Sequence, residues 1–561
     1  MSVFIGYPSF MAYQMMKGKK GNNDGFPSIP GMIARYSALG LTNEQMAENP
    51  VWKDLMGNGY DLQMKNFAWS GMSGVGGYEM NFNLWANNVP SVPDISMSTT
   101  TTSVSVSVGN STYNNNLIYI HINNWDINKN HWLKVTSTYE DGDLVFVFYN
   151  DSNTKKIGLP ANGYVNILAY PEFKGSHMYI STTSNKQGSF TIEQLPLYPG
   201  FILGDGVDDF AVTEKELNFE DTYTVYTAFI PFQNDPANNM VLCGKNHLKD
   251  FYITYSDLNR ITFYSAEKLV FESLSKGFNI LCCKRTPDKM VIKNLITDKS
   301  SEILANDLID NPGLYYLWKG AVFANYAKAA IAGQTICNGY FSIDEDDEKV
   351  LNWYKKQYPW LFPYQAWTVT GKTNENEDRA TIANITGNGN DLVLSNFEFI
   401  EGSGYNEEGE YAGYLVTDGV DDEIISAKLI QFADKFTIVG DWKFMEDRND
   451  NAGLLKANQI YIYNATTGMR IYLKQGSKNY PFSCKKINAL TSDGWVYDEK
   501  WDKYKVYPIG SDIDISSRFL GFYGSNFTKI ALKNLGIYND QLLSKDDCIK
   551  AYNYLQTLKA K

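Results

Sequence analysis

The chain contains two near-copies of the same phrases, and this repetition constrains its fold more than any other feature. Residues 57–67 read GNGYDLQMKNF, and residues 387–397 read GNGNDLVLSNF. A second phrase, DGVDD, occurs at 205–209 and again at 418–422. Because an internal repeat at this spacing is the signature of a duplicated unit, the sequence predicts two copies of one domain.

The two copies also end alike. A helical stretch at 343–357 follows Ser342, and another at 545–558 follows Ser544. Ser is a favoured N-cap residue, because its hydroxyl accepts a hydrogen bond from a backbone N–H of the first helical turn. We therefore expect each copy to be a long β region closed by a short helix.

The spacing of the phrases locates an insertion in the first copy. Phe67 and Asp205 are 138 positions apart, whereas Phe397 and Asp418 are only 21 apart. The excess of 117 residues is enough for a small domain. We place this inserted domain at residues 83–197.

Alternating residues within the insert indicate strands. Residues 103–108 read SVSVSV, which is the pattern of a half-buried strand. Residues 117–122 and 144–149 are apolar and aromatic, and they are expected to be further strands. The insert is therefore predicted to be a small β-sandwich.

Composition and charge exclude several classes of protein. The chain of 561 residues is 44% hydrophobic and 14% aromatic, which favours folded β domains over disorder. Its formal net charge of −13 argues against nucleic acid and anionic membranes as partners. The N-terminus lacks the basic and apolar regions of a signal peptide, and no apolar run is long enough to span a membrane. The six cysteines form no C-x-x-C pair and predict neither a disulfide framework nor a zinc site.

The order of the repeated phrases carries a family resemblance. A G-N-G-x-D-L phrase, then D-G-V-D-D, then a strand resembles the laminin-G-like, concanavalin A-like jelly-roll family, over about three quarters of the chain. The resemblance implies an all-β fold of two jelly-roll β-sandwiches, each closed by a short helix, with the small β-sandwich inserted in the first. The expected domains are an N-terminal leader or anchor (1–30), the first jelly roll (31–82 plus 198–363), the insert (83–197) and the second jelly roll (364–561).

A second resemblance concerns function. Residues 191–209 and 353–361 resemble segments of virion fibre or appendage proteins of gut Bacteroidetes (crAss-like) phages. This implies a structural subunit of head or tail, made in the host cytoplasm and located in the virion. Its partners would be other virion proteins, copies of itself as a homo-oligomer, and host surface polysaccharide. The alternative is a carbohydrate-binding or glycan-processing protein of a gut bacterium or mobile element.

Catalytic motifs were sought and not found. Laminarinase-type glycosidases of the jelly-roll family carry E-x-D-x-x-E on one strand, and this chain lacks it. The acidic run 344–348 lacks that spacing and lies at a helix start, where acids complement the helix dipole. No G-x-S-x-G elbow or P-loop occurs. We therefore predict a protein that is not an enzyme, without a cofactor other than calcium.

Calcium enters through the family resemblance, which implies an ion at the rim of the jelly roll. The DGVDD phrases supply the candidate ligands, because calcium is bound by six to eight oxygens. The alternative is a turn in which Asp and Gly serve only the backbone. The candidates are Asp205, Asp208 and Asp209 in the first copy and Asp418, Asp421 and Asp422 in the second.

Tryptophans in polar surroundings are the candidates for sugar binding, because an aromatic ring stacks on a pyranose face. Trp85 precedes two asparagines, and Trp125 adjoins Asp126 in a polar stretch of the insert. Trp495 and Trp501 lie in a charged stretch that is expected to be a long loop. The alternative for each Trp is a place in a core or an interface.

Overall fold

The computed structural model describes most of the chain, and its contacts divide the chain into two compact units. The first holds Met1–Glu272, Ile280–Lys293 and Ser300–Ile343, and the second holds Ser273–Asn279, Asn294–Lys299 and Asp344–Lys561. Among the described residues, no helix is both long and apolar enough to cross a bilayer. The described residues are 24–78, 95–109, 120–121, 131–150, 153–167, 177–182, 187–232, 240–245, 251–257, 260–275, 277–306, 313–319, 326–387, 389–428, 430–433, 435–445, 453–457, 460–465, 468–473, 486–493, 495–498, 503–505, 516–517, 522–523, 526–527 and 529–560.

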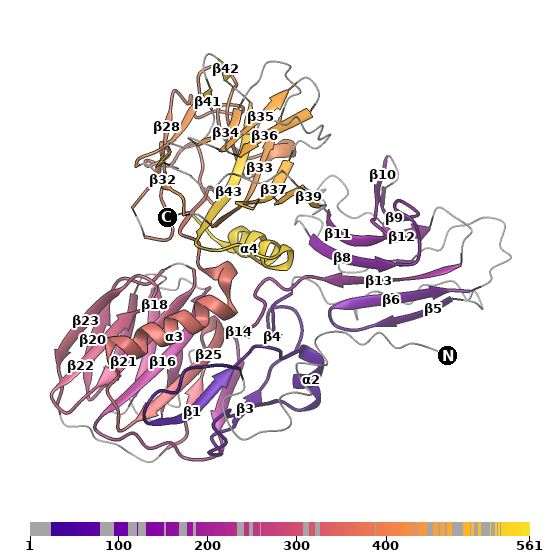
Figure 1. The fold of residues 1–561 in the computed structure, drawn as a ribbon. Helices are drawn as coiled ribbons and strands as arrows, with labels where there is room; N and C mark the ends of the chain where they lie inside the picture. The colour runs from indigo at the N-terminus through magenta and orange to yellow at the C-terminus, as the bar shows by residue number, and fades with distance from the viewer. Residues whose placement is uncertain are drawn as a thin grey trace. The chain divides into compact units, whose positions relative to one another are not determined.

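In the described residues, the first copy is built from two antiparallel sheets of eight strands each, and Figure 1 labels many of these strands. One sheet has the order β23 (Lys299–Leu304), β22 (Lys289–Asn294), β21 (Asn279–Arg285), β16 (Tyr223–Pro231), β25 (Lys328–Asn338), β14 (Ile202–Asp205) and β4 (Gly74–Val75), and β1 (Met32–Ser37) also pairs with β25. The other has the order β2 (Val51–Trp52), β3 (Leu62–Lys65), β15 (Phe210–Thr213), β24 (Tyr316–Leu317), β17 (Met240–Gly244), β18 (Tyr252–Asp257), β19 (Arg260–Ser265) and β20 (Glu267–Phe271). A short helix, α2 (Asn43–Glu48), lies between β1 and β2 in the chain.

The central strand β16 shows why these segments pair. Its sequence YTVYTAFIP is aromatic and β-branched, and every residue is buried. Tyr223 packs edge-on against Phe251 and Phe263, with ring centroids 5.7 and 6.4 Å apart. Burial on both faces of a strand favours such a continuous apolar run over an alternating one.

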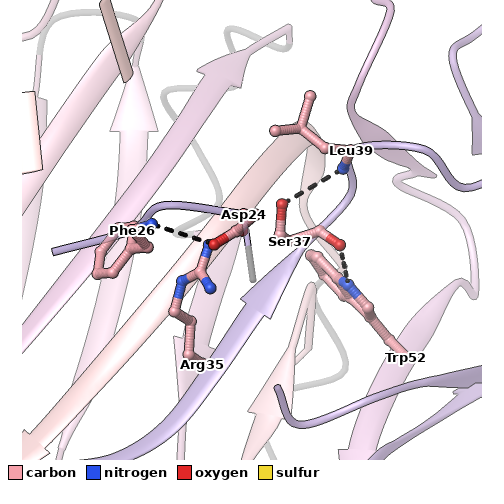
Figure 2. Close-up of polar contacts among 6 residues, drawn as sticks. All are labelled: Asp24, Phe26, Arg35, Ser37, Leu39 and Trp52. Atoms are coloured by element: carbon pink, nitrogen blue, oxygen red, sulfur yellow. Dashed lines mark hydrogen bonds and ion pairs between the residues drawn. The ribbon is translucent and has the colours of Figure 1, made fainter. Parts of the chain in front are cut away.

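The segment before β1 packs on the first copy. Phe26 and Ile29 are 5% and 2% exposed. The Arg35 guanidinium pairs with Asp24 and lies 4.1 Å from the centre of the Phe26 ring. Figure 2 shows this pair, together with the Trp52 indole donating to the Ser37 carbonyl at 2.9 Å. Residues 24–30, which the sequence assigned to a leader, thus contribute to the packing of this copy.

Between β4 and β14 the chain forms nine strands that pair with one another in the described residues. They make a four-stranded sheet of β10 (Asn153–Gly158), β9 (Leu144–Asn150), β12 (His177–Thr182) and β7 (Ile120–His121), and a five-stranded sheet of β11 (Asn162–Ile167), β8 (His131–Ser137), β13 (Gly188–Gln194), β6 (Ser103–Val108) and β5 (Ile95–Thr99). Val104, Val106 and Val108 of β6 point into a separate apolar core, so the strand predicted at 103–108 is confirmed. The boundaries of this insert remain a prediction.

The second copy repeats the sheet of the first copy that contains β16 and β25. Its order is β29 (Gly404–Asn406), β30 (Tyr414–Val416), β43 (Ile530–Asn539), β33 (Phe436–Phe444), β37 (Lys486–Thr491), β38 (Trp495–Asp498) and β39 (Lys503–Lys505), and β26 (Gln365–Thr368) also pairs with β43. The smaller sheets are β27 (Thr381–Ile382), β28 (Leu392–Ser395) and β31 (Glu423–Ser426); β34 (Gly453–Ala457), β35 (Ile460–Ala465) and β36 (Gly468–Leu473); β32 (Ile430–Gln431) with β40 (Ser516–Ser517); and β41 (Phe522–Tyr523) with β42 (Asn526–Phe527). In the described residues, α3 (Asp344–Gln357) and η3 (Pro359–Leu361) follow β25 in the chain, and η4 (Gly409–Tyr411) and α4 (Lys545–Thr557) belong to the second copy. These sheets, with those of the first copy and the insert, confirm the predicted all-β class.

The repetition extends to strand register. β16 pairs with β25 residue by residue as β33 pairs with β43, and Ala228↔Gly333 in the first copy corresponds to Asp441↔Asn534 in the second. Both pairings then skip one residue, which is Ala332 in β25 and Lys533 in β43. The two copies therefore share a β-bulge as well as a topology.

The closing helix α4 packs on β33 and β43 (Figure 1). Gly536 of β43 permits this approach, because a Cβ there would lie 3.1 Å from Leu555 Cδ1. Ser544 caps α4 by accepting from Asp547 N at 3.1 Å, as expected. Ser342 does not take the equivalent place, since α3 begins at Asp344 and the Ser342 N–H donates to Thr224 Oγ1 at 3.0 Å.

Candidate functional site

The first DGVDD phrase forms a tight turn between β14 and β15. Asp205 Oδ1 accepts from the N–H of Val207 at 2.8 Å and of Asp208 at 3.4 Å. The Asp209 carboxylate accepts from Asp205 N at 2.9 Å. Gly206 has φ +79°, a conformation that favours glycine. A turn predicts both features: Asp side chains that accept hydrogen bonds from backbone N–H groups, and a glycine with positive φ.

The second phrase repeats the turn almost atom for atom. Asp418 Oδ1 accepts from Val420 N at 2.7 Å and from Asp421 N at 3.3 Å. Asp422 Oδ2 accepts from Asp418 N at 2.7 Å, and Gly419 has φ +77°. The repeated phrase therefore encodes a repeated turn.

Each turn gathers three carboxylates whose oxygens lie within 4.8 Å of one another. The first and last Asp of each turn already accept N–H groups of that turn, and three carboxylates fall short of the six to eight oxygens that calcium takes. Burial raises the pKa of Asp209 to about 7 and that of Asp422 to about 6. The hydrogen bonds that each carboxylate accepts within its turn lower the pKa, but by less than burial raises it. The observed contacts are those of a turn, and calcium binding remains a prediction.

Of the four candidate tryptophans, the structure describes only Trp495. Trp85, Trp125, Asp126 and Trp501 lie outside the described residues. Trp495 is partly exposed and begins β38, which pairs with both β37 and β39. The prediction that it lies in a long loop is wrong, because residues 495–498 pair as a strand with both neighbours.

A group of polar side chains that the sequence did not single out meets on the second copy. Asp441 of β33 is 1% exposed. Its Oδ2 accepts from the hydroxyl of Tyr414 at 3.0 Å, the hydroxyl of Tyr552 at 2.8 Å and Gln556 Nε2 at 3.1 Å. Burial and the nearby Asp441 charge raise the pKa of Tyr414 and of Tyr552 well above the ordinary value, so both hydroxyls remain donors. α4 and β30 thereby converge on one carboxylate.

Aromatic rings and lysines extend this group along the sheet. The half-buried Tyr411 meets Tyr414 edge-on, with ring centroids 6.3 Å apart. Lys443 Nζ lies 4.2 Å from the centre of the Tyr411 ring and 5.1 Å from that of Tyr414. Lys533 Nζ lies 5.7 Å from the Tyr414 ring centre. We call the whole group the tyrosine site; its members are Tyr411, Tyr414, Asp441, Lys443, Lys533, Tyr552 and Gln556.

The first copy provides an internal comparison. By strand register, Phe201, Ala228, Ile230 and Ala332 stand where the second copy has Tyr414, Asp441, Lys443 and Lys533. All four residues of the first copy are at most 3% exposed. At these four positions the first copy builds the same sheet with buried apolar residues, and the second copy has polar ones.

The arrangement suits a polar ligand with apolar faces. A tyrosine ring offers a flat apolar surface, and hydroxyl, amide and ammonium groups beside it offer hydrogen bonds. A carbohydrate presents the complementary combination of C–H faces and hydroxyls. Position-by-position alignment of the two copies would have singled out Tyr414, Asp441 and Lys443 against their apolar counterparts, but not their meeting with α4.

Comparison with known proteins places the chain in no family. No protein-family model and no curated protein matches the chain. Among solved structures, Trypanosoma rangeli sialidase in complex with sialic acid is 10% identical with a TM-score of 0.26, over 81% of each chain. The binding domain of botulinum neurotoxin DC in complex with rat synaptotagmin II is 9% identical with a TM-score of 0.27, over 61% of this chain and 90% of that one. At such low similarity, neither match assigns a function to this chain.

The comparison nevertheless corrects one prediction. The missing catalytic motifs led us to predict that the protein is not an enzyme, and the similarity to sialidases contradicts this. The prediction is wrong because the absence of a few known motifs does not exclude enzymes built from other residues. The phage resemblance finds no counterpart among these structures, so the predicted virion role and location remain predictions.

Proposed function

We propose that the protein binds carbohydrate and that the tyrosine site of its second copy is the binding surface. One observation carries the proposal: a buried carboxylate, held by two tyrosines and a glutamine, occupies a sheet position where the first copy has Ala228. Burying a carboxylate costs free energy that an apolar side chain does not. Because the same sheet forms without Asp441, the fold alone does not account for the site.

The contacts suggest how the ligand is held. Tyr411 is the partly exposed ring of the site and would stack on a sugar face. Asp441 is enclosed, so it acts as a positioning residue that fixes Tyr414 and the Gln556 amide. Lys443 stands over both rings on a flexible stem, which can move aside or bond a sugar hydroxyl.

Retention of the full-length protein on immobilised polysaccharides tests the proposal, with released sugar measured in the same samples. Tyr411→Ala should weaken retention at least about tenfold, because aromatic contacts at the centre of a site dominate binding. Tyr149→Ala is the matched control, since Tyr149 is 42% exposed on β9 of the insert and far from this site in the chain.

Equal retention of Tyr411→Ala and the parent protein would refute the proposed site. Equal loss in the Tyr149→Ala control would indicate a general surface effect and would also refute it. Release of sugar by the parent protein, reduced in Tyr411→Ala, would extend the proposal from binding to glycan processing.

A further inference from the structure

The tyrosine site carries two lysines, and the first copy forms the corresponding sheet without a charge at either position. Lys443 and Lys533 both lie within 6 Å of the Tyr414 ring centre, at 5.1 and 5.7 Å. Both are partly exposed. Their counterparts in the first copy are Ile230 and Ala332, which are buried and uncharged. The second copy therefore places two ammonium groups beside the ring of Tyr414.

The bulge explains why Lys533 reaches the site. In both copies one residue of the long strand is left out of the pairing, and such an extra residue re-aims its side chain. In the first copy this residue is Ala332, and in the second it is Lys533. Lys443 is paired with Ala531, two positions away, so the bulge brings the second lysine beside the first.

The carboxylate of the tyrosine site is engaged by uncharged groups. Asp441 Oδ2 takes its three hydrogen bonds from uncharged donors, which are two tyrosine hydroxyls and an amide. The protein as a whole has a formal net charge of −13, so it repels polyanions in general. An anionic ligand would therefore be attracted by this local pair of lysines and not by the overall charge.

We propose that the tyrosine site selects a glycan that carries carboxylate or sulfate groups, with Lys443 and Lys533 as the specificity-determining residues. The proposal rests on the proposed function above. A single acidic group beside the stacked sugar would contact both ammonium groups. A neutral sugar would still stack on Tyr411. Tyr411 would thus account for binding, and the two lysines would account for the preference for acidic glycans.

Matched polymer pairs test the selectivity in the full-length protein. Polygalacturonate is compared with the same polymer after carboxyl reduction, and dextran sulfate is compared with dextran. We expect the parent protein to bind at least one anionic polymer at least about tenfold more tightly than its neutral partner, and raised salt should reduce this ratio. The pair that shows the preference identifies carboxylate or sulfate as the recognised group.

Variants locate the effect. Lys443→Gln and Lys533→Gln should each lower the anionic-to-neutral ratio by about three- to tenfold, and the double variant should bring it near one. Lys435→Gln, at an exposed lysine just before β33, is the control and should leave the ratio unchanged. Tyr411→Ala should weaken both members of a pair.

The outcomes separate the two proposals. Equal binding of anionic and neutral polymers, lost in Tyr411→Ala, would overturn the selectivity and leave the proposed function standing. An anionic preference that survives the double lysine variant would also overturn the selectivity at this site. Binding of no polymer would overturn both.

Discussion

Removing the Asp441 carboxylate should release α4 from its sheet. Asp441→Ala deletes the acceptor for the Tyr414 and Tyr552 hydroxyls, at 3.0 and 2.8 Å, and for Gln556 at 3.1 Å. The alanine itself is compatible with the strand, because Ala228 occupies the same register position in the first copy. The loss therefore reports the hydrogen bonds and not backbone strain.

The magnitude follows from burial. Tyr414 and Tyr552 are 8% and 1% exposed, so their hydroxyls would lose their acceptor with little access to water. A buried donor left unsatisfied costs about 1–3 kcal/mol, whereas the partly exposed Gln556 can turn to solvent. Two such hydroxyls give about 4 kcal/mol. That corresponds to roughly a thousandfold increase in the opening of α4.

Hydrogen exchange of the full-length protein measures this opening directly. Backbone amides of α4 (Lys545–Thr557) should exchange roughly a thousandfold faster in Asp441→Ala, while those of β16 in the first copy should not change. The triple variant Asp441→Ala/Tyr414→Phe/Tyr552→Phe should recover most of the protection, because removing both partners of a buried hydrogen bond is nearly neutral.

Two results would refute this reasoning. Unchanged exchange of α4 in Asp441→Ala would mean that the hydrogen bonds do not hold the helix. A triple variant no better protected than the single one would mean that unsatisfied hydroxyls are not the cause of the loss.

Two further predictions concern the repeated turns and glycines. The pKa values of Asp209 and Asp422, about 7 and about 6 against an ordinary 3.8, mean that the folded state binds these protons more tightly. Stability should therefore fall as pH rises above about 4, up to about pH 6 for Asp422 and about pH 7 for Asp209, by at most about 1.4 kcal/mol per pH unit for each carboxyl. Thermal unfolding of the Asp209→Asn/Asp422→Asn variant should depend less on pH over this range. Gly404→Ala should lower the free energy of unfolding by about 3 kcal/mol, because its Cβ would lie 2.5 Å from Asn374 Oδ1. Gly402 has the same kind of backbone, at φ +90°, but open space around it, so Gly402→Ala should cost only about 1 kcal/mol in the same assay. A steeper pH profile in the Asn variant, or equal costs for the two glycines, would contradict these assignments.

The sequence predicted the features that depend on local chemistry. The DGVDD turns follow from Asp and Gly within five residues, and the SVSVSV strand follows from its alternation. The N-cap at Ser544 followed from the same local reasoning, whereas Ser342 was misassigned because its hydrogen-bonded register with Thr224 is a long-range feature.

The tyrosine site could not be predicted in the same way. Tyr414, Asp441 and Tyr552 are spread over 138 positions and meet only when β30, β43 and β33 pair and α4 docks. No local motif encodes such a meeting. The prediction of Trp495 in a loop failed for a related reason: β38 has only four residues, and it becomes a strand through its pairing with β37 and β39.

The central claim is that the tyrosine site binds carbohydrate, and the most direct test is a structure of the full-length protein with a retained oligosaccharide bound. We predict a sugar ring stacked on Tyr411, with its polar groups at Gln556 and the two lysines. A sugar bound at another surface, with the tyrosine site in its ligand-free arrangement, would contradict the account.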